Sequence, residues 1–137
     1  MRREYEHGSK YAFWRWKDIE WNNVLYMRRL YFFHCPWFTI MVNVFHHGDL
    51  QRHMHDHPVD FISFIIWGSY IELTEGGTTK RRRWFNFVPA ETKHRIIKIV
   101  SDKCVSLVFT GRRRREWGFW TEHGWLQWQQ YQKIYHD

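Results

Sequence analysis

The sequence has few of the residues that cross-link or interrupt a small fold. Its 137 residues include two cysteines, three prolines and eight glycines. Cys35 and Cys104 lie far apart, so a disulfide-rich scaffold is excluded, and we expect both thiols to be small core residues in a reducing cytoplasm. The polar segment 1–6 lacks the apolar stretch of a signal peptide, which also favours a cytoplasmic location. No apolar run approaches the ~20 residues of a membrane helix, so no membrane partner is expected.

Aromatic residues and positive charge are, by contrast, abundant. The chain has ten Trp, eleven Phe and seven Tyr. Each large aromatic buries about 150–250 Å², so a chain of this length can fill one core and forms about one domain. Lys and Arg number 21 against 14 Asp and Glu, a formal charge of +7, which favours an anionic partner. The charge alone leaves open whether that partner is a nucleic acid or a small metabolite.

From Leu30 onward, runs of β-branched and aromatic residues alternate with turn signals, which indicates about eight short strands. The clearest hairpin turn is Glu75-Gly76-Gly77-Thr78, because paired glycines supply positive φ. This pattern predicts an all-β barrel or jelly roll. The runs are 30–33, 37–45, 60–67, 70–74, 80–88, 94–100 and 103–110, with 117–120 as one more short strand.

The two ends of the chain differ from the strand region. Residues 11–16 fit either a short strand or a docking arm, and Asp18 predicts a short helical turn that continues to Tyr26. Trp and Tyr recur at spacings of three and four from Trp125 to Tyr135, which predicts an amphipathic helix. The predicted organisation is an N-terminal arm with an aromatic segment (1–29), a barrel (30–122) and a C-terminal helix packed on the barrel (123–137).

The densest group of candidate metal ligands is the segment His53-Met54-His55-Asp56-His57-Pro58-Val59-Asp60. In an extended segment alternate side chains share a face, so His53, His55 and His57 can converge on one ion at about 2.0–2.1 Å. Asp60 opens the next strand and can add an oxygen, and His94 can return from another strand. Such a set suits Fe(II), Zn, Ni, Co, Mn or Cu. Spacing alone leaves a chance polar loop as the alternative.

The order of these motifs resembles that of the cupins, small double-stranded β-helix barrels of the RmlC-like kind. Cupins carry a first motif of Gly, His-x-His, an acidic residue and Gly, and a second motif Pro-x-Gly-x-x-His. The first is matched by Gly48, His55-Asp56-His57, Asp60 and Gly68, and the second by the segment from Pro89 to His94, with Ala90-Glu91 in place of x-Gly. His-Asp-His-Pro-x-Asp-Phe, Trp117-Gly118-Phe119 and Gly124-Trp125 resemble a narrower group of bacterial and phage cupins.

The resemblance implies one small cupin barrel with a short C-terminal helix and a divalent transition metal, Fe(II) being favoured over Zn, Ni, Mn, Co or Cu. The implied ligands are His55, His57, Asp60 and His94. His53 remains an alternative to His57, because the pair His53 and His55 leaves the spacing before Asp60 that the general pattern prefers. Small cupins often dimerise, so the resemblance also implies a homodimer.

Two basic runs, 80–83 and 112–115, are most simply solvated surface. Alternation along a strand sends two side chains of the first run to each face, and we take Arg81 and Arg83 as candidates for pairing a substrate anion. A buried arginine there needs an anionic partner such as Glu72. Because the aromatics fall where strands need core, a nucleic-acid partner is not expected.

The leading functional interpretation is a metal-dependent enzyme resembling non-haem Fe(II) dioxygenases, acting on a small anionic substrate. One alternative is a non-catalytic cupin that binds a metal or a ligand. Another is a metal-free isomerase or epimerase of a sugar nucleotide, in which a barrel histidine acts as base. The sequence does not single out a catalytic residue.

Overall fold

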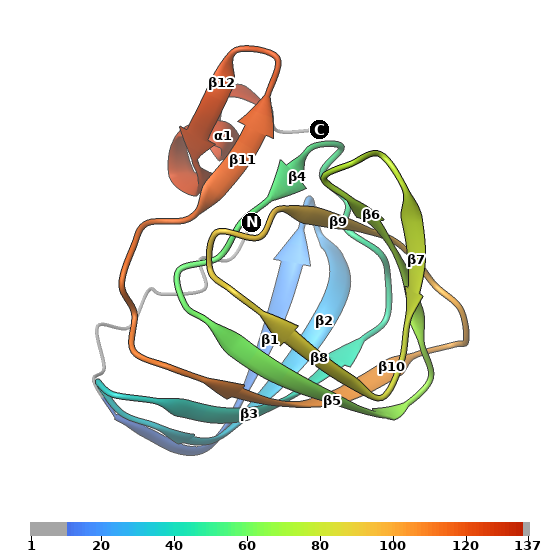
Figure 1. Ribbon diagram of the computed structural model, residues 1–137. Helices are drawn as coiled ribbons and strands as arrows, with labels where there is room; N and C mark the ends of the chain where they lie inside the picture. The colour runs from blue at the N-terminus through green and yellow to red at the C-terminus, as the bar shows by residue number, and fades with distance from the viewer. Residues whose placement is uncertain (1–10, 136–137) are drawn as a thin grey trace.

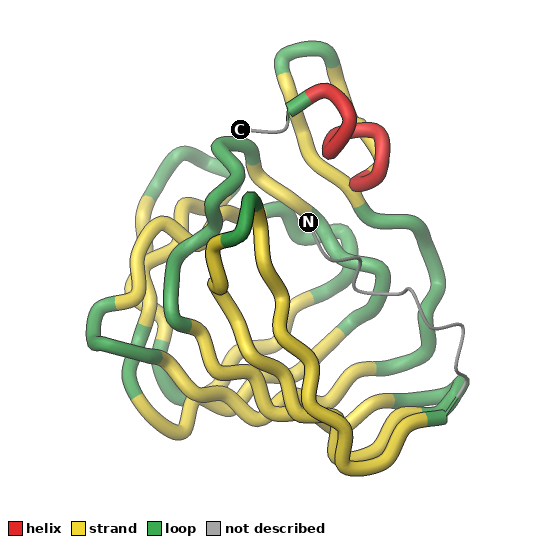
Figure 2. Tube along the Cα trace, turned by 180° about the vertical axis from the view of Figure 1, so that it is seen from behind, coloured by secondary structure: helices red, strands yellow, loops and turns green. Residues whose placement is uncertain are grey.

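Residues 11–135 form twelve β-strands and one helix in a computed structural model (Figures 1 and 2). The strands lie in two six-stranded antiparallel sheets, which confirms the predicted all-β class. In chain order the elements are β1 (Ala12–Trp21), β2 (Val24–His34), β3 (Thr39–Phe45), β4 (Met54–His55), β5 (Phe61–Trp67), β6 (Tyr70–Thr74), β7 (Thr79–Arg82), β8 (Phe85–Val88), β9 (His94–Ile99), β10 (Cys104–Thr110), β11 (Gly118–Thr121), β12 (Gly124–Gln127) and α1 (Trp128–Ile134).

The sheets form a jelly roll whose interior is partly hollow. One sheet has the strand order β1-β2-β3-β10-β5-β8 and the other β12-β11-β4-β9-β6-β7. Along β3 and β10 alternate side chains are buried, as the period of a half-buried strand requires. The inward side chains of both sheets leave a cavity of about 1050 Å³. This cavity, rather than a fully packed core, is the space that a functional site can use.

The N-terminal segment is a β-hairpin that belongs to the first sheet. β1 and β2 pair from Ala12 to His34, and Asn22 and Asn23 turn the chain with φ of 49° and 65°. Two positive φ angles in a two-residue loop are the geometry of the turn that Asn and Gly favour in hairpins. The predicted helical turn from Asp18 to Tyr26 is therefore wrong. Of the predicted arm 1–29, residues 1–10 lie outside the described residues.

The C-terminal segment is a second hairpin, β11–β12, followed by α1 (Figure 1). The helix begins at Trp128, because residues 124–127 pair with β11 as a strand. It is therefore shorter than the predicted helix 123–137, of which residues 136–137 lie outside the described residues. A Cβ at Gly118 would lie 2.0 Å from Leu126 O, so only glycine fits this hairpin. A separate core cluster of Trp21, Phe119, Trp128 and Tyr131 holds the unit together.

The outer face of the first sheet is apolar and uncovered in the described chain. Phe64 lies opposite Phe85, and Phe109, Ile62 and Phe87 form a neighbouring cross-strand row. Phe85 and Phe87 are 55% and 60% exposed. Monomeric proteins rarely expose contiguous apolar patches larger than a few hundred Å², so this face suits a protein contact.

Among residues 11–135, no helix is long and apolar enough to cross a membrane.

Candidate metal centre

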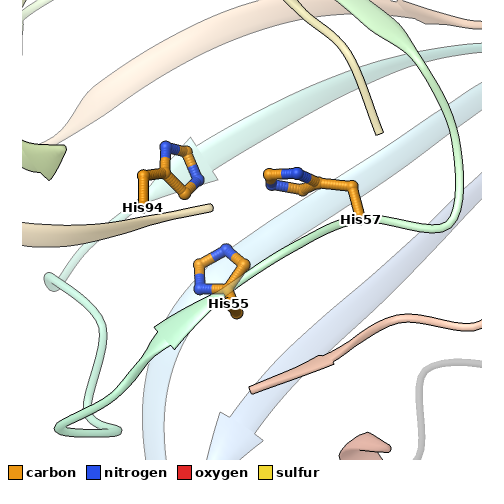
Figure 3. Close-up of side chains that lie close together, drawn as sticks. All are labelled: His55, His57 and His94. Atoms are coloured by element: carbon orange, nitrogen blue, oxygen red, sulfur yellow. The ribbon is translucent and has the colours of Figure 1, made fainter. Parts of the chain in front are cut away.

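Three histidines converge inside the barrel (Figure 3). His55 lies on β4, His57 follows in the next loop, and His94 opens β9. β4 and β9 pair at His55 and His94, while His55 and His57 are two residues apart and share a face. The ring centroids are 4.8–5.2 Å apart, and one nitrogen of each ring lies within 4.8 Å of the others. We call these three residues the histidine triad.

Carboxylates behind two of the rings fix their orientation. His94 Nδ1 donates to Glu72 Oε2 at 2.8 Å, and Glu72 also accepts a hydrogen bond from Arg82. His55 Nδ1 lies 3.3 Å from Asp49 Oδ2, which also accepts from the backbone N–H of Ile96 at 2.9 Å. In metal sites such a carboxylate holds the ring tautomer and leaves the other nitrogen free for the metal.

The third ring, His57, has a buried Nδ1 with no hydrogen-bond partner among the described residues. A buried polar atom without a partner costs about 1–3 kcal/mol. Its backbone N–H is satisfied by Ala90 O at 3.0 Å, so the loop itself is well held. One nitrogen of this ring lies within 4.8 Å of a nitrogen of His55 and of His94, so all three rings can reach a cation placed between them.

His55 and His57 are neutral near pH 7, as histidine ligands of a metal must be. Burial lowers the pKa of His55 to about 4, and the nearby Asp49 carboxylate offsets only part of that effect. Burial lowers the pKa of His57 well below its ordinary value, and His94 and His55 lower it further. Nitrogens bound to one tetrahedral ion lie roughly 3.3 Å apart, so small ring rotations bring this donor set onto a divalent transition metal.

Asp60, the fourth predicted ligand, is not brought to the triad. Its Oδ1 accepts from the backbone N–H of Ala90 at 2.7 Å and from Arg114 at 2.7 Å. These hydrogen bonds hold the pKa of its carboxyl below the ordinary value. Arg114 also binds Glu91, so Asp60 fixes the turn that precedes His94.

His53, the alternative ligand, also lies outside the triad. Its Nε2 donates to Glu122 Oε2 at 3.0 Å, and its Nδ1 accepts from Tyr131 Oη at 2.9 Å. Its ring meets Tyr131 and Tyr135 edge to face. His53 therefore joins the barrel to the C-terminal unit.

Asp56 lies between two triad members and has a role that the sequence analysis missed. Its side chain is 1% exposed and points away from the triad. It accepts from the Gly118 N–H at 2.8 Å, from two indoles, Trp120 and Trp125, at 3.1 and 3.0 Å, and from Arg115 at 3.2 Å. The sequence contained a sign of this role. Asp56 stands between two histidines that share a face of the strand, so its own side chain must point to the other face, and the chain is rich in tryptophan, whose indole N–H can donate to a carboxylate.

The arginines predicted to pair a substrate anion lie on the outside. Arg81 and Arg83 are exposed, and Arg81 donates to Ser69 Oγ at 3.0 Å. Arg82 lies on the opposite face of the strand and points inward, where it forms an ion pair with Glu72. The cationic side chains that do line the cavity with the triad are Arg15, Lys17 and Arg29 of the β1–β2 hairpin and Arg113 of the segment after β10.

Comparisons with known proteins find relatives by fold alone. No family model matches the sequence, and no curated protein matches it. The polyketide cyclase RemF from Streptomyces resistomycificus has a TM-score of 0.64 at 12% identity, covering 88% of this chain and 86% of that chain. A cupin-2 domain protein from Rhodospirillum rubrum has 0.61 at 11%, covering 80% and 77%. The crystal structure of Fe(II) HppE has 0.57 at 10%, covering 70% and 55%.

Proposed function

We propose that this chain, which has the cupin fold, holds a divalent transition metal ion on His55, His57 and His94 and uses it in an oxidoreductase reaction on a small anionic substrate. The observation that carries the proposal is the triad itself. Burial keeps His55 and His57 neutral, and His55 and His94 each have a carboxylate behind Nδ1. The buried Nδ1 of His57 has no hydrogen-bond partner among the described residues.

A bound ion supplies Lewis acidity and open coordination positions for substrate or O₂. Three nitrogen donors suit Fe(II), Zn, Ni, Co, Mn or Cu, and the fold shared with Fe(II) HppE supports Fe(II) first. The chain's own residues orient the ligands and enclose the substrate. Glu72 keeps the His94 ring in place, Asp49 keeps the His55 ring in place, and the cavity surrounds the substrate. We infer that a fourth position stays open, because Asp60 is engaged by Arg114.

Metal analysis of protein made without a histidine tag tests the proposal. After anaerobic addition of Fe(II) or Zn(II) and desalting, we expect about one equivalent, as for a single site. His94→Ala should lose that metal, whereas His53→Gln should keep it, since His53 lies outside the triad. His123→Ala, at an exposed histidine, is the matched control. Wild-type protein that retains no metal would refute the proposal, and loss of metal in His53→Gln would refute the ligand set.

A second measurement separates an enzyme from a binding protein. The Fe(II)-loaded chain should consume O₂ when small carboxylates or phosphates are added, and His94→Ala should not. Metal binding without O₂ uptake or turnover of any such compound would favour a non-catalytic metal protein.

A further inference from the structure

A second, smaller cavity of about 170 Å³ lies behind the histidine triad, between β8 of one sheet and β6, β7 and β9 of the other. β7 and β8 are each the last strand in the order of their own sheet, so this cavity lies where the two sheet edges meet. Of the residues that border it, only Tyr70 and His94 also border the main cavity. These two side chains separate the two spaces, and we call the smaller one the rear pocket. Its polar side chains are Tyr70, Glu72, Arg82, Asn86, Thr92 and His94.

Arg82 brings hydrogen-bond donors to the mouth of the rear pocket. Its Nε donates to Glu72 Oε1, and Glu72 Oε2 accepts from His94 Nδ1, so both carboxylate oxygens are engaged. A guanidinium has five N–H donors, and the four on the terminal nitrogens of Arg82 have no partner among residues 11–135. The Arg82 side chain is 36% exposed, whereas Glu72 and His94 are buried. Arg82 can therefore bind an ion that enters from solvent while it keeps its contact with Glu72.

Asn86 brings a second donor from the opposite sheet. Its neighbours Phe85 and Phe87 lie on the outer face of β8, so Asn86 points inward, opposite Ser63. Asn86 is 9% exposed, and its Nδ2 has no hydrogen-bond partner among the described residues. A buried amide without a hydrogen bond destabilises a fold, and an apolar side chain at this position would avoid that cost. The amide borders the rear pocket, where a ligand can accept its hydrogen bond.

We propose that the rear pocket binds a small, singly charged carboxylate, of the size of formate or acetate, between Arg82 and Asn86. The terminal N–H groups of a guanidinium match the two oxygens of a carboxylate, and the Asn86 amide adds one more donor. Glu72 offsets part of the Arg82 charge, which favours a monoanion over a phosphate dianion. Such an ion is an effector and not a substrate, because Tyr70 and His94 stand between it and the main cavity.

Nuclear magnetic resonance of the metal-free, ¹⁵N-labelled protein tests the site independently of the metal proposal. Sodium formate is the probe, and formamide, which has nearly the same shape and no charge, is the control, both at constant ionic strength. The side-chain amide signal of Asn86 is assigned by its absence from the spectrum of Asn86→Leu. We expect this signal to shift with formate until it saturates and to stay in place with formamide. The absence of a saturable shift, or an equal shift with formamide, would overturn the inference.

Arginine variants identify the cation that binds the ion. Arg82→Gln should weaken formate binding at least about 10-fold, the usual worth of hydrogen bonds to a charged group. Arg82→Lys keeps the charge beside Glu72 but not the planar fork, and it should also bind formate more weakly than the wild type. Arg83→Gln removes the same charge from an exposed neighbouring position and should change little. Equal losses in Arg82→Gln and Arg83→Gln would mean a general charge effect and would refute the site, as would a folded Arg82→Lys with unchanged affinity.

Asn86→Leu separates a binding role of the amide from a structural one. Leucine has a similar volume and no polar atom, so the variant should unfold at a higher urea concentration than the wild type. Formate should raise the urea midpoint of the wild type, because a ligand that binds only the folded state stabilises it, and should leave the midpoint of Asn86→Leu unchanged. An Asn86→Leu variant that is less stable than the wild type and is stabilised equally by formate would show that the amide is structural and would overturn the inference.

Discussion

Glu72 is the residue through which the metal proposal can be tested most sharply without touching a ligand. Its carboxylate is buried between His94 Nδ1 and Arg82. Burial alone raises the pKa of this carboxyl, but the hydrogen bonds and charges of His94 and Arg82 outweigh it and hold the pKa below the ordinary value. Glu72 is therefore an anion at neutral pH, and it makes the opposite nitrogen of His94 a better donor.

Glu72→Gln removes the charge and keeps the shape. The amide oxygen can still accept from His94 Nδ1, so the ring stays in place, while its basicity falls. Loss of such a carboxylate behind a ligand usually weakens metal binding about 10- to 100-fold, or about 1.4–2.7 kcal/mol. Arg82 is about a third exposed and can be solvated after its partner is neutralised, so the fold should survive.

The measurement is a competition titration of Zn(II) against a chromophoric chelator at pH 7.5. Glu75→Gln is the control, because Glu75 follows the same strand and forms an exposed pair with Lys93. The expected order of affinity is wild type equal to Glu75→Gln, then Glu72→Gln, with His94→Ala below detection. Zn(II) affinity of a folded Glu72→Gln within threefold of wild type would refute the role given to this carboxylate.

Three further predictions concern stability, pH and assembly. Asp56→Ala should destabilise the protein by about 3–5 kcal/mol in urea unfolding, because three N–H groups and Arg115 lose one buried acceptor; an unchanged unfolding midpoint would contradict this. The metal-free protein should lose stability on acidification, since a pKa of about 4 for His55 lets only the unfolded state bind that proton between pH 6.5 and 4. The expected loss in the free energy of unfolding is about 3 kcal/mol, from about 2.5 pH units at 1.36 kcal/mol each. Denaturant titrations at pH 7 and 4.5 measure it, and the free energy of unfolding of His55→Gln should depend less on pH than that of the wild type. The apolar outer face of the first sheet should pack against a second copy. β3, β10, β5 and β8 span about 19 by 24 Å in projection, a flat area of about 460 Å², which is a little over half of the ~800 Å² per partner of a standard interface before the relief of the side chains is counted. Phe87→Glu should then shift a dimer to monomer in sedimentation equilibrium, and a wild-type monomer at high concentration would rule the dimer out.

The triad could be predicted because its geometry follows from local rules. His55 and His57 share a face by strand parity, and a turn after Pro89 returns His94 to the same place. The choice between His53 and His57 could not be made from spacing, because it depends on Tyr131 and Glu122, which lie far along the chain. Asp60 had a plausible position, but its distant partner Arg114 was not predictable.

The predicted elements differ from the structure at one hairpin turn and at one crossing between the two sheets. Asn22-Asn23 is a hairpin turn, and a predicted helical turn across it does not give Lys17 and Arg29 their positions on β1 and β2. The predicted strand 80–88 is two strands in different sheets, because the chain crosses between the sheets at Trp84, whose φ is 68°. Before the crossing, the alternation of side chains along β7 turns Arg82 inward and leaves Arg81 outside.

The shortness of β4 has a kinetic consequence. This strand is two residues long, pairs with β11 on one side and with β9 on the other, and continues into Asp56, the acceptor for the C-terminal hairpin. Amide exchange of His55 and of β11 is thus expected to occur through one shared opening event. The rate at which a bound ion is released would then be set by that opening and not by the strength of the individual bonds to the ion. A substitution that destabilises the C-terminal hairpin should therefore speed up metal exchange and amide exchange together.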